Sequence, residues 1–258
     1  MKLATWNVNS LNVRLPRVLA WLAAAKPDLV CLQETKLEDA KFPRQQLADA
    51  GYAAHYSGQR TYNGVALLVR DGIGAATDIL TALPGFADVQ QRVLAATIAG
   101  TRVIGFYVPN GQAVDSDKYR YKLEWCRAAT AFLASELARH PALALAGDFN
   151  IAPEDRDVHD PELWRGQVLF SDPERRVFAD WLALGLKDSF RLFEQPEKAF
   201  SWWDYRQLAF PKNRGLRIDH ILLSAPLAAK CSGCWIDRNA RKGEKPSDHA
   251  PVIAELAP

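Results

Sequence analysis

The chain has 258 residues, a length that suits one large α/β or all-β domain as readily as two small ones. Hydrophobic residues make up 48% and charged residues 24%, which excludes collagen-like, disordered and disulfide-scaffold proteins. The formal net charge is only +2, but residues 198–245 contain ten Lys and Arg against four Asp and Glu. This local excess of positive charge indicates an anionic partner.

Strand and helix patterns alternate along the chain, which predicts α/β layers. Residues 2–8 and 29–33 have strand patterns, and apolar residues recur between them at helical spacing, from Leu15 to Leu22. Further strands are expected at residues 64–69, 93–98, 102–108, 143–146, 218–223 and 251–255.

Two longer helices are predicted in the second half of the chain. One covers residues 118–139, and the other begins with Asp172 as its N-cap and Pro173 in its first position, and ends at Gly185. Residues 154–171 and 201–217 have the composition of long polar loops, which in compact domains are usually functional. No low-complexity linker divides the chain, so we expect a single domain over residues 1–258.

The N-terminus lacks the apolar core of a signal peptide, and no apolar run approaches the ~18 residues of a membrane helix. We therefore expect a cytoplasmic protein with no membrane partner. No interaction tail is recognisable, which favours a monomer.

Polar side chains that can bind metals or phosphates follow the predicted strands repeatedly. Ligands of open α/β sheets gather at strand ends, so these residues are candidates for one common site. Singly, each carboxylate could instead cap the next helix or hold a turn. The candidates are Asn7, Asn9, Glu34, Tyr107, Asn110, Gln112, Asp148, Asn150, Asp219, Asp248 and His249.

Asp219 lies within an apolar strand pattern, and burying a carboxylate is costly unless it is paired or binds metal. His249 is its natural partner. Oxygen ligands without a His and Cys cluster suit Mg²⁺ or Mn²⁺ better than zinc. In metal-assisted phosphoester hydrolysis Glu34 would hold the cation and Asp148 would orient and deprotonate a water, with Asn150 placing it.

Six sequence blocks then occur in order: LATWNVNS (3–10), LQETK (32–36), YVPNG (107–111), GDFN (147–150), LRID (216–219) and KPSDHAP (245–251). As an ordered set they resemble the exonuclease III family of apurinic/apyrimidinic (AP) endonucleases. The resemblance covers almost the whole chain. It implies a four-layer α/β sandwich of the DNase I type, in which two central, mostly antiparallel sheets are flanked by helices.

The resemblance also implies roles by matched position. Glu34 becomes the principal ligand of a single Mg²⁺ or Mn²⁺, assisted by Asn7 and Asp248. Asp148 becomes the residue that activates or orients the attacking water, with Asn150 beside it.

In the same way Tyr107 resembles the phosphate-site tyrosine of the family, and Asp219 and His249 resemble its buried carboxylate–histidine pair. The implied activity is Mg²⁺-dependent DNA repair: AP endonuclease, 3′→5′ exonuclease and 3′-phosphatase action on duplex DNA that leaves a 3′-hydroxyl. The expected substrate is double-stranded DNA with an abasic site or a blocked 3′ end.

A segment that interleaves aromatic and cationic residues predicts the DNA contact surface. In it Trp202 or Trp203 would enter the duplex or stack in the lesion pocket while cations meet phosphates. The remaining contacts are expected from Asn9, Arg60, Tyr62, Asn110, Gln112, Arg206, Lys212 and Arg214.

Three alternatives stay open at this level. The enzyme could be a 3′-end-processing specialist with little AP endonuclease activity, and the sequence of residues 154–171 does not decide between the two. It could act on a small phosphoester with the same machinery, or be a DNA-binding module with an inactive site. The aromatic and cationic segment argues against the small phosphoester, and the intact set of acidic residues and His249 argues against the inactive module.

Overall fold

The computed structural model describes residues 1–257 and contains two six-stranded sheets that face each other. The first has the order β13-β14-β1-β2-β4-β3 and the second β5-β6-β7-β8-β12-β9. The strands of the first are β1 (Lys2–Asn7), β2 (Leu29–Gln33), β3 (Tyr52–Ser57), β4 (Val65–Arg70), β13 (Cys231–Ile236) and β14 (Val252–Leu256). Those of the second are β5 (Thr77–Leu80), β6 (Val93–Ile98), β7 (Thr101–Tyr107), β8 (Leu143–Asp148), β9 (Lys187–Asp188) and β12 (Asp219–Leu223).

Each sheet has one parallel pair of neighbours at its centre, and every other pairing is antiparallel. The parallel pairs are β1 with β2 and β7 with β8. A parallel pair needs a crossover, and helices α1 (Leu11–Ala25) and α3 (Asp117–Arg139) supply the two crossovers. Each half of the molecule therefore contains one βαβ unit. The carboxyl ends of β1, β2, β7 and β8 consequently lie near one another.

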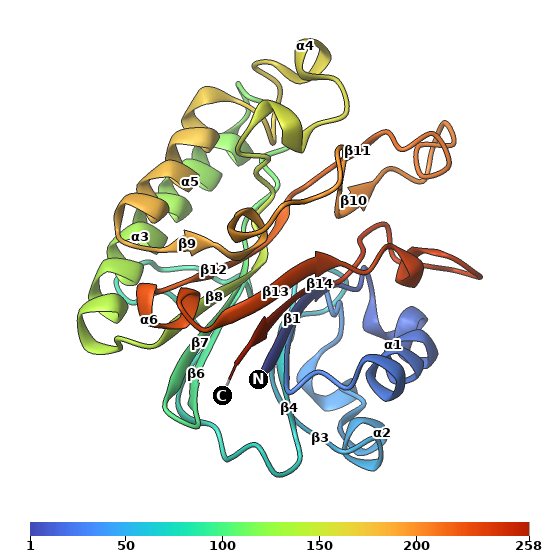
Figure 1. Ribbon diagram of the computed structural model, residues 1–258, viewed down its shortest axis with the longest axis vertical. Helices are drawn as coiled ribbons and strands as arrows, with labels where there is room; N and C mark the ends of the chain where they lie inside the picture. The colour runs from blue at the N-terminus through green and yellow to red at the C-terminus, as the bar shows by residue number, and fades with distance from the viewer. Residues whose placement is uncertain (258) are drawn as a thin grey trace.

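Helices cover the outer face of each sheet, so the molecule has four layers (Figure 1). Helices α1 and α2 (Arg44–Asp49) pack on the first sheet through a core that includes Trp6, Leu22 and Leu47. Helices α3 and α5 (Asp172–Ala183) pack on the second through a core that includes Trp125 and Trp181. The expected sandwich of two mostly antiparallel sheets between helices is confirmed.

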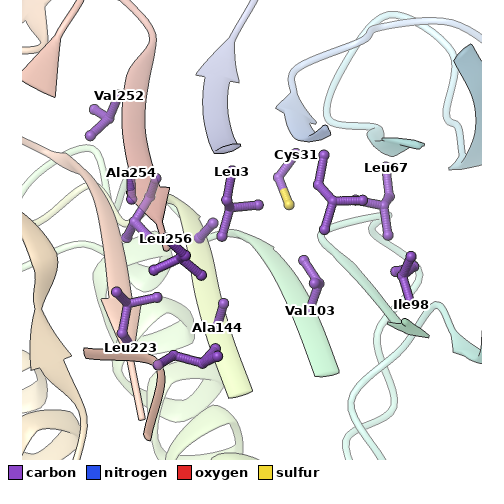
Figure 2. Close-up of a cluster of buried hydrophobic side chains, with 14 of the residues drawn as sticks. Leu3, Cys31, Leu67, Ile98, Val103, Ala144, Leu223, Val252, Ala254 and Leu256 are labelled. Atoms are coloured by element: carbon purple, nitrogen blue, oxygen red, sulfur yellow. The ribbon is translucent and has the colours of Figure 1, made fainter. Parts of the chain in front are cut away.

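The space between the sheets is filled by small and branched side chains from both (Figure 2). Side chains alternate along each strand, so Leu3 and Cys31 point to the partner sheet while Ala4 and Val30 face the helices. Both faces of the central strands are thus buried, which explains the nearly continuous apolar run of residues 29–32.

Two excursions project from the end of the sandwich opposite the chain termini (Figure 1). The first, residues 154–171, contains a 3₁₀ turn η2 (Asp155–Asp157) and the short helix α4 (Pro161–Trp164). The second, residues 201–217, is a two-stranded ribbon of β10 (Trp202–Trp203) and β11 (Gly215–Leu216). The other short elements are α6 (Ala225–Ala228), η1 (Asp39–Lys41), η3 (Ser189–Leu192) and η4 (Arg238–Arg241).

The structure corrects several predicted boundaries. Helix α5 is capped by Ser171 and not by Asp172, because Ser171 and Glu174 form a reciprocal capping box that leaves Asp172 inside the first turn. Strand β8 runs on to Asp148, two residues beyond its predicted end, because it pairs there with β7 and β12. Within residues 1–257, no helix is long and apolar enough to cross a membrane.

Candidate active site

The ends of the four parallel strands bring together four polar residues from distant parts of the chain. Asn7 ends β1, Glu34 follows β2, Tyr107 ends β7 and Asp148 ends β8. Asn7 links the two sheets, since its Nδ2 donates to Glu34 Oε1 and to Asp148 Oδ2, both at 2.9 Å. The Tyr107 hydroxyl donates to the same Glu34 Oε1 at 2.9 Å. The expected convergence at one rim is therefore present.

Asp219 and His249 form the buried pair that the sequence predicts. Asp219 lies directly opposite Asp148 in the β12–β8 register, and its Oδ2 is 2.8 Å from His249 Nδ1. The other ring nitrogen, Nε2, is 3.8 Å from Asp148 Oδ2. His249 reaches this position from the irregular loop before β14, where it forms an isolated bridge with Trp202. The imidazole thus lies between two carboxylates.

The charges of this group follow from burial and proximity. Burial alone would lower the pKa of His249, but Asp219 and Asp148 raise it to about 10. Burial raises the pKa of Asp148 to about 7, and the His249 imidazolium opposes that rise. At neutral pH His249 therefore carries a proton, and Asp148 titrates in the range where a general base works well.

Glu34 and Tyr107 take opposite protonation states although they share a hydrogen bond. Burial opposes ionisation of Glu34, but the Lys36 ammonium, 2.7 Å from Glu34 Oε2, and the Asn7 amide hold its pKa below the usual range. Burial and the carboxylates of Glu34 and Asp148 raise the pKa of Tyr107 well above its usual value. Tyr107 is therefore a neutral hydrogen-bond donor, and Glu34 is a carboxylate.

Asn150 is held beside Asp148 by a left-handed backbone, with φ of 49°. The Asn150 backbone N–H donates to Asp148 Oδ1 at 2.9 Å, and the left-handed conformation brings the side-chain Nδ2 to 3.3 Å from Asp148 Oδ2. Asparagine tolerates this region better than most residues. The Asn110 Nδ2 donates to Asn150 Oδ1 at 3.0 Å, which joins a second predicted residue to the group.

Two of the predicted metal ligands have other partners in this structure. Asp248 Oδ1 accepts from Asn9 Nδ2 at 3.0 Å, and Asp248 Oδ2 accepts from Trp202 Nε1 at 3.1 Å. Asn7 turns its amide nitrogen toward Glu34, while its Oδ1 accepts from the Asn9 backbone at 3.0 Å. Asp248 thus lies at the edge of the site, bonded to Asn9 and Trp202. Asn7 faces Glu34 and Asp148 with its amide nitrogen and acts there as a hydrogen-bond donor.

The predicted DNA contacts divide into exposed residues, two half-buried residues and one buried exception. Asn110 and Gln112 line a cavity of about 700 Å³ together with Tyr62 and Tyr107, which connects the catalytic end of β7 to the surface. Asn9 and Trp202 are half-buried beside Asp248. The exposed residues are Arg60, Tyr62, Asn110, Gln112, Arg206, Lys212 and Arg214.

Of the two tryptophans that the sequence offers as DNA contacts, the structure disfavours Trp203. Its side chain is 0% exposed, packs against Phe200 and Ala250, and donates through Nε1 to Asn213 Oδ1 at 3.1 Å. Neighbouring residues of a strand face opposite ways, so only Trp202 lies on the side that borders the site.

Replacement of Trp203 by alanine should therefore lower stability and not DNA affinity. We expect the free energy of unfolding to fall by about 3–5 kcal/mol, the usual cost of removing a buried aromatic side chain. Urea unfolding measures the loss, and duplex binding by the folded fraction should match wild type. A folded Trp203→Ala protein with markedly weaker binding would return Trp203 to the contact surface.

Sequence reasoning missed three residues that touch the site. Lys36 donates to Asn9 Oδ1 at 2.7 Å in addition to its ion pair with Glu34. The Arg92 guanidinium lies 4.8 Å from the centre of the Tyr107 ring, and the Tyr205 hydroxyl is 3.4 Å from Asn9 Nδ2. Lys36 follows Glu34 closely enough to be found from sequence, whereas Arg92 and Tyr205 are brought near only by the fold.

Comparison with known proteins identifies the family. Residues 4–249 match the Endonuclease/Exonuclease/phosphatase family. The chain is 34% identical over 273 residues to exodeoxyribonuclease III of Haemophilus influenzae, with 99% of this chain and 100% of the relative covered. It belongs to this family and is a nuclease-type hydrolase, which confirms the resemblance drawn from its motifs.

Two solved structures are similar over almost their whole length. The 3′ phosphatase NExo from Neisseria, bound to a product DNA hairpin, is 47% identical with a TM-score of 0.96, and 99% of each chain is covered. An AP endonuclease from Archaeoglobus fulgidus is 38% identical with a TM-score of 0.94, again over 99% of each chain.

Proposed function

We propose that this enzyme is a Mg²⁺-dependent DNA repair phosphodiesterase that acts on duplex DNA and leaves a 3′-hydroxyl. The observation that carries the proposal is the His249 imidazolium held between Asp219 and Asp148, at the rim where Glu34 and Asn7 lie. It offers a positive charge, a base and hydrogen-bond donors within one small space, as hydrolysis of a phosphodiester requires.

In this mechanism Asp148 orients a water and accepts its proton as the water attacks phosphorus, and the bond between phosphorus and the 3′ oxygen of the DNA breaks to leave the 3′-hydroxyl. Asn150 keeps the Asp148 carboxylate in place through its backbone N–H. His249, which Asp219 orients and keeps protonated, donates to a phosphoryl oxygen and offsets the negative charge that develops there. Tyr107, a neutral phenol, is placed to donate toward the phosphate or the leaving oxygen.

The residues present fit a hard divalent cation. Glu34 offers an ionised carboxylate at the rim, and the Asp148 carboxylate is joined to it through Asn7 Nδ2, so two carboxylates lie close together, which suits Mg²⁺. Asp148, Asp219 and His249 also place ligand atoms within 4.8 Å of one another. Both ring nitrogens of His249 face carboxylates, however, Nδ1 at 2.8 Å from Asp219 Oδ2 and Nε2 at 3.8 Å from Asp148 Oδ2, so we assign the cation to Glu34. When bound, it would neutralise phosphate charge.

Among DNA substrates we expect processing of 3′ ends to dominate. The 47% identical structure is of a 3′ phosphatase, whereas the AP endonuclease from Archaeoglobus fulgidus is 38% identical. AP endonuclease activity is the second candidate, supported by that structure. The enzyme is expected to act as a monomer, since all the residues of the mechanism come from one chain.

A labelled duplex with one abasic-site analogue, assayed beside a nicked duplex that ends in a 3′-phosphate, tests this proposal. Each is incubated with Mg²⁺ and with EDTA, and an excess of unlabelled duplex is added to a parallel assay of a small phosphoester. We expect metal-dependent loss of the 3′-phosphate, slower incision at the abasic site, and inhibition by the duplex. Hydrolysis of the small phosphoester alone, unaffected by DNA, would overturn the assignment.

Replacement of Glu34 by glutamine should weaken metal binding in particular. Because the variant loses the anionic ligand but keeps the shape of the side chain, the Mg²⁺ concentration for half-maximal rate should rise by about tenfold or more. A Mg²⁺ titration of the 3′-phosphatase rate measures this shift. An unchanged titration curve would place the cation elsewhere.

A further inference from the structure

A buried ion pair lies directly behind the catalytic end of β8. Lys122 of helix α3 is 0% exposed, and its ammonium bonds the carboxylate of Glu174 in helix α5, whose side chain is 1% exposed. The desolvation cost of burying two opposite charges is offset only when the remaining donors and acceptors of the pair also form hydrogen bonds. The other partners of this pair are therefore informative.

The Lys122 ammonium has three donors, and the structure provides a partner for each. Beside Glu174 they are the backbone carbonyl of Asn150 at 2.7 Å and that of Asn110 at 3.1 Å. These two residues are the ones joined by a side-chain hydrogen bond next to Asp148. One buried cation thus fixes the backbone of both asparagines from behind.

Glu174 extends this connection to the excursion of residues 154–171. Its Oε1 accepts from the Leu169 backbone at 3.0 Å, and its Oε2 accepts from the backbone and the hydroxyl of Ser171, at 3.0 and 2.5 Å. Leu169 in turn accepts from the Ala152 backbone at 2.8 Å. The C-terminal end of the excursion is therefore joined through Glu174 and Lys122 to the asparagines of the site.

Asn150 depends on such support because its conformation is unfavourable by itself. Its φ is 49°, a region that is costly for a residue other than glycine, and its backbone N–H bonds to Asp148 Oδ1. Of the two backbone carbonyls that Lys122 bonds, that of Asn150 is the closer, at 2.7 Å. A shift of Asn150 by about 1 Å would displace Asp148 relative to the reacting atoms, and shifts of that size reduce rates by about 10²-fold.

We infer that Lys122 is a positioning residue for hydrolysis, and that the Lys122–Glu174 pair makes the placement of Asn150 and Asn110 depend on the end of the 154–171 excursion. The inference rests on the proposed function. To the proposed mechanism it adds Lys122, a buried residue that does not contact DNA. It also adds a physical connection from the 154–171 excursion to Asp148, the proposed general base. Changes in that excursion can alter the reaction rate through this pair without any contact to substrate.

The chain offers a matched control for a purely structural ion pair. Arg102 and Glu136 form a second buried pair, with 4% and 0% of their side chains exposed, and Glu136 lies on the same helix α3. Arg102 donates to the Asp78 backbone and not to any residue of the site. The double replacements K122M/E174Q and R102M/E136Q both exchange a buried ion pair for neutral side chains, so neither leaves an isolated buried charge.

The test compares kcat, KM and urea unfolding of the two double variants with wild type, on the nicked duplex with a 3′-phosphate. We expect K122M/E174Q to lose about 10- to 100-fold in kcat with KM nearly unchanged, and R102M/E136Q to keep its kcat. Adding Asn150→Ala should reduce kcat far less in the K122M/E174Q background than in wild type, since both changes disturb the same peptide.

A second variant keeps the test decisive if K122M/E174Q does not fold. Lys122→Arg retains the charge opposite Glu174 but presents a planar donor group, so it should fold and lose about tenfold in kcat at similar KM. Wild-type kcat in a folded Lys122 variant would overturn the inference while leaving the proposed function intact. Wild-type protein without activity on any DNA substrate would instead overturn the proposed function.

Discussion

Replacement of Asp148 by asparagine is expected to lower kcat by about 10²- to 10⁴-fold, the usual contribution of a general base. Asparagine has nearly the same shape and keeps one oxygen, which can accept from the Asn150 backbone as Asp148 Oδ1 does, whereas the bond from Asn7 Nδ2 to Asp148 Oδ2 is lost. It cannot accept a proton from water. The variant should therefore fold and bind duplex DNA much as wild type does, and single-turnover kinetics on the nicked duplex would isolate the chemical step.

The pH dependence provides an independent measure of the same group. Burial raises the pKa of Asp148 to about 7 against the opposing effect of His249, so its carboxyl is protonated below that pH and ionised above it. Wild-type kcat/KM should accordingly rise about tenfold per pH unit on the acidic side and reach a plateau above about 7.

The Asp148→Asn variant should lack that rise, because the titrating base is gone. A variant that still rises with the same midpoint would assign the base to another residue. Glu34 is a poor candidate for the midpoint, since Lys36 and Asn7 hold its pKa below the usual range even though burial opposes this.

The buried pair of Asp219 and His249 was predictable because a carboxylate is conspicuous within an apolar sequence. Asp219 interrupts an apolar strand, and such a residue needs a partner, which the structure identifies as His249. Three of the four strand ends could be predicted for a similar reason, since Asn7, Glu34 and Asp148 each follow an apolar run. The local sequence pattern is therefore enough to predict a site residue when burial of that residue would be unfavourable without a specific partner.

The remaining features depend on tertiary contacts that no local pattern contains. Trp202 and Trp203 are adjacent and chemically identical, and only the packing of the β10–β11 ribbon decides which one is buried. The sequence around Lys122 predicts only a helix. The ion pair of Lys122 with Glu174 could not be predicted, because it forms through the packing of α3 against α5. Strands β3, β5 and β13 were missed because they lie at or next to sheet edges, and their exposed residues weaken the apolar signal.

Replacement of Asp219 by asparagine should shift the alkaline side of the pH profile. Burial opposes protonation of His249, and the carboxylates of Asp219 and Asp148 together raise its pKa to about 10. The Asp219 carboxylate, 2.8 Å from His249 Nδ1, is the closer of the two. Without it the lowering effect of burial is less opposed, so the pKa of His249 falls. The variant should lose the imidazolium, and with it activity, at a pH where wild type is still fully active.

The expected loss is about 10²- to 10³-fold in kcat on the alkaline plateau of wild type, comparable to removal of one donor from a site that stabilises developing negative charge. His249→Gln is the reference, because it lacks the titrating group and should show the same loss at every pH. If Asp219→Asn instead follows the wild-type profile, His249 does not act as a charged donor. If it is reduced equally at all pH values, Asp219 orients the ring without setting its charge. In that case the two carboxylates have separate roles, Asp219 in orienting the ring and Asp148 in proton transfer. A shifted alkaline limb would show instead that both act through the proton on His249.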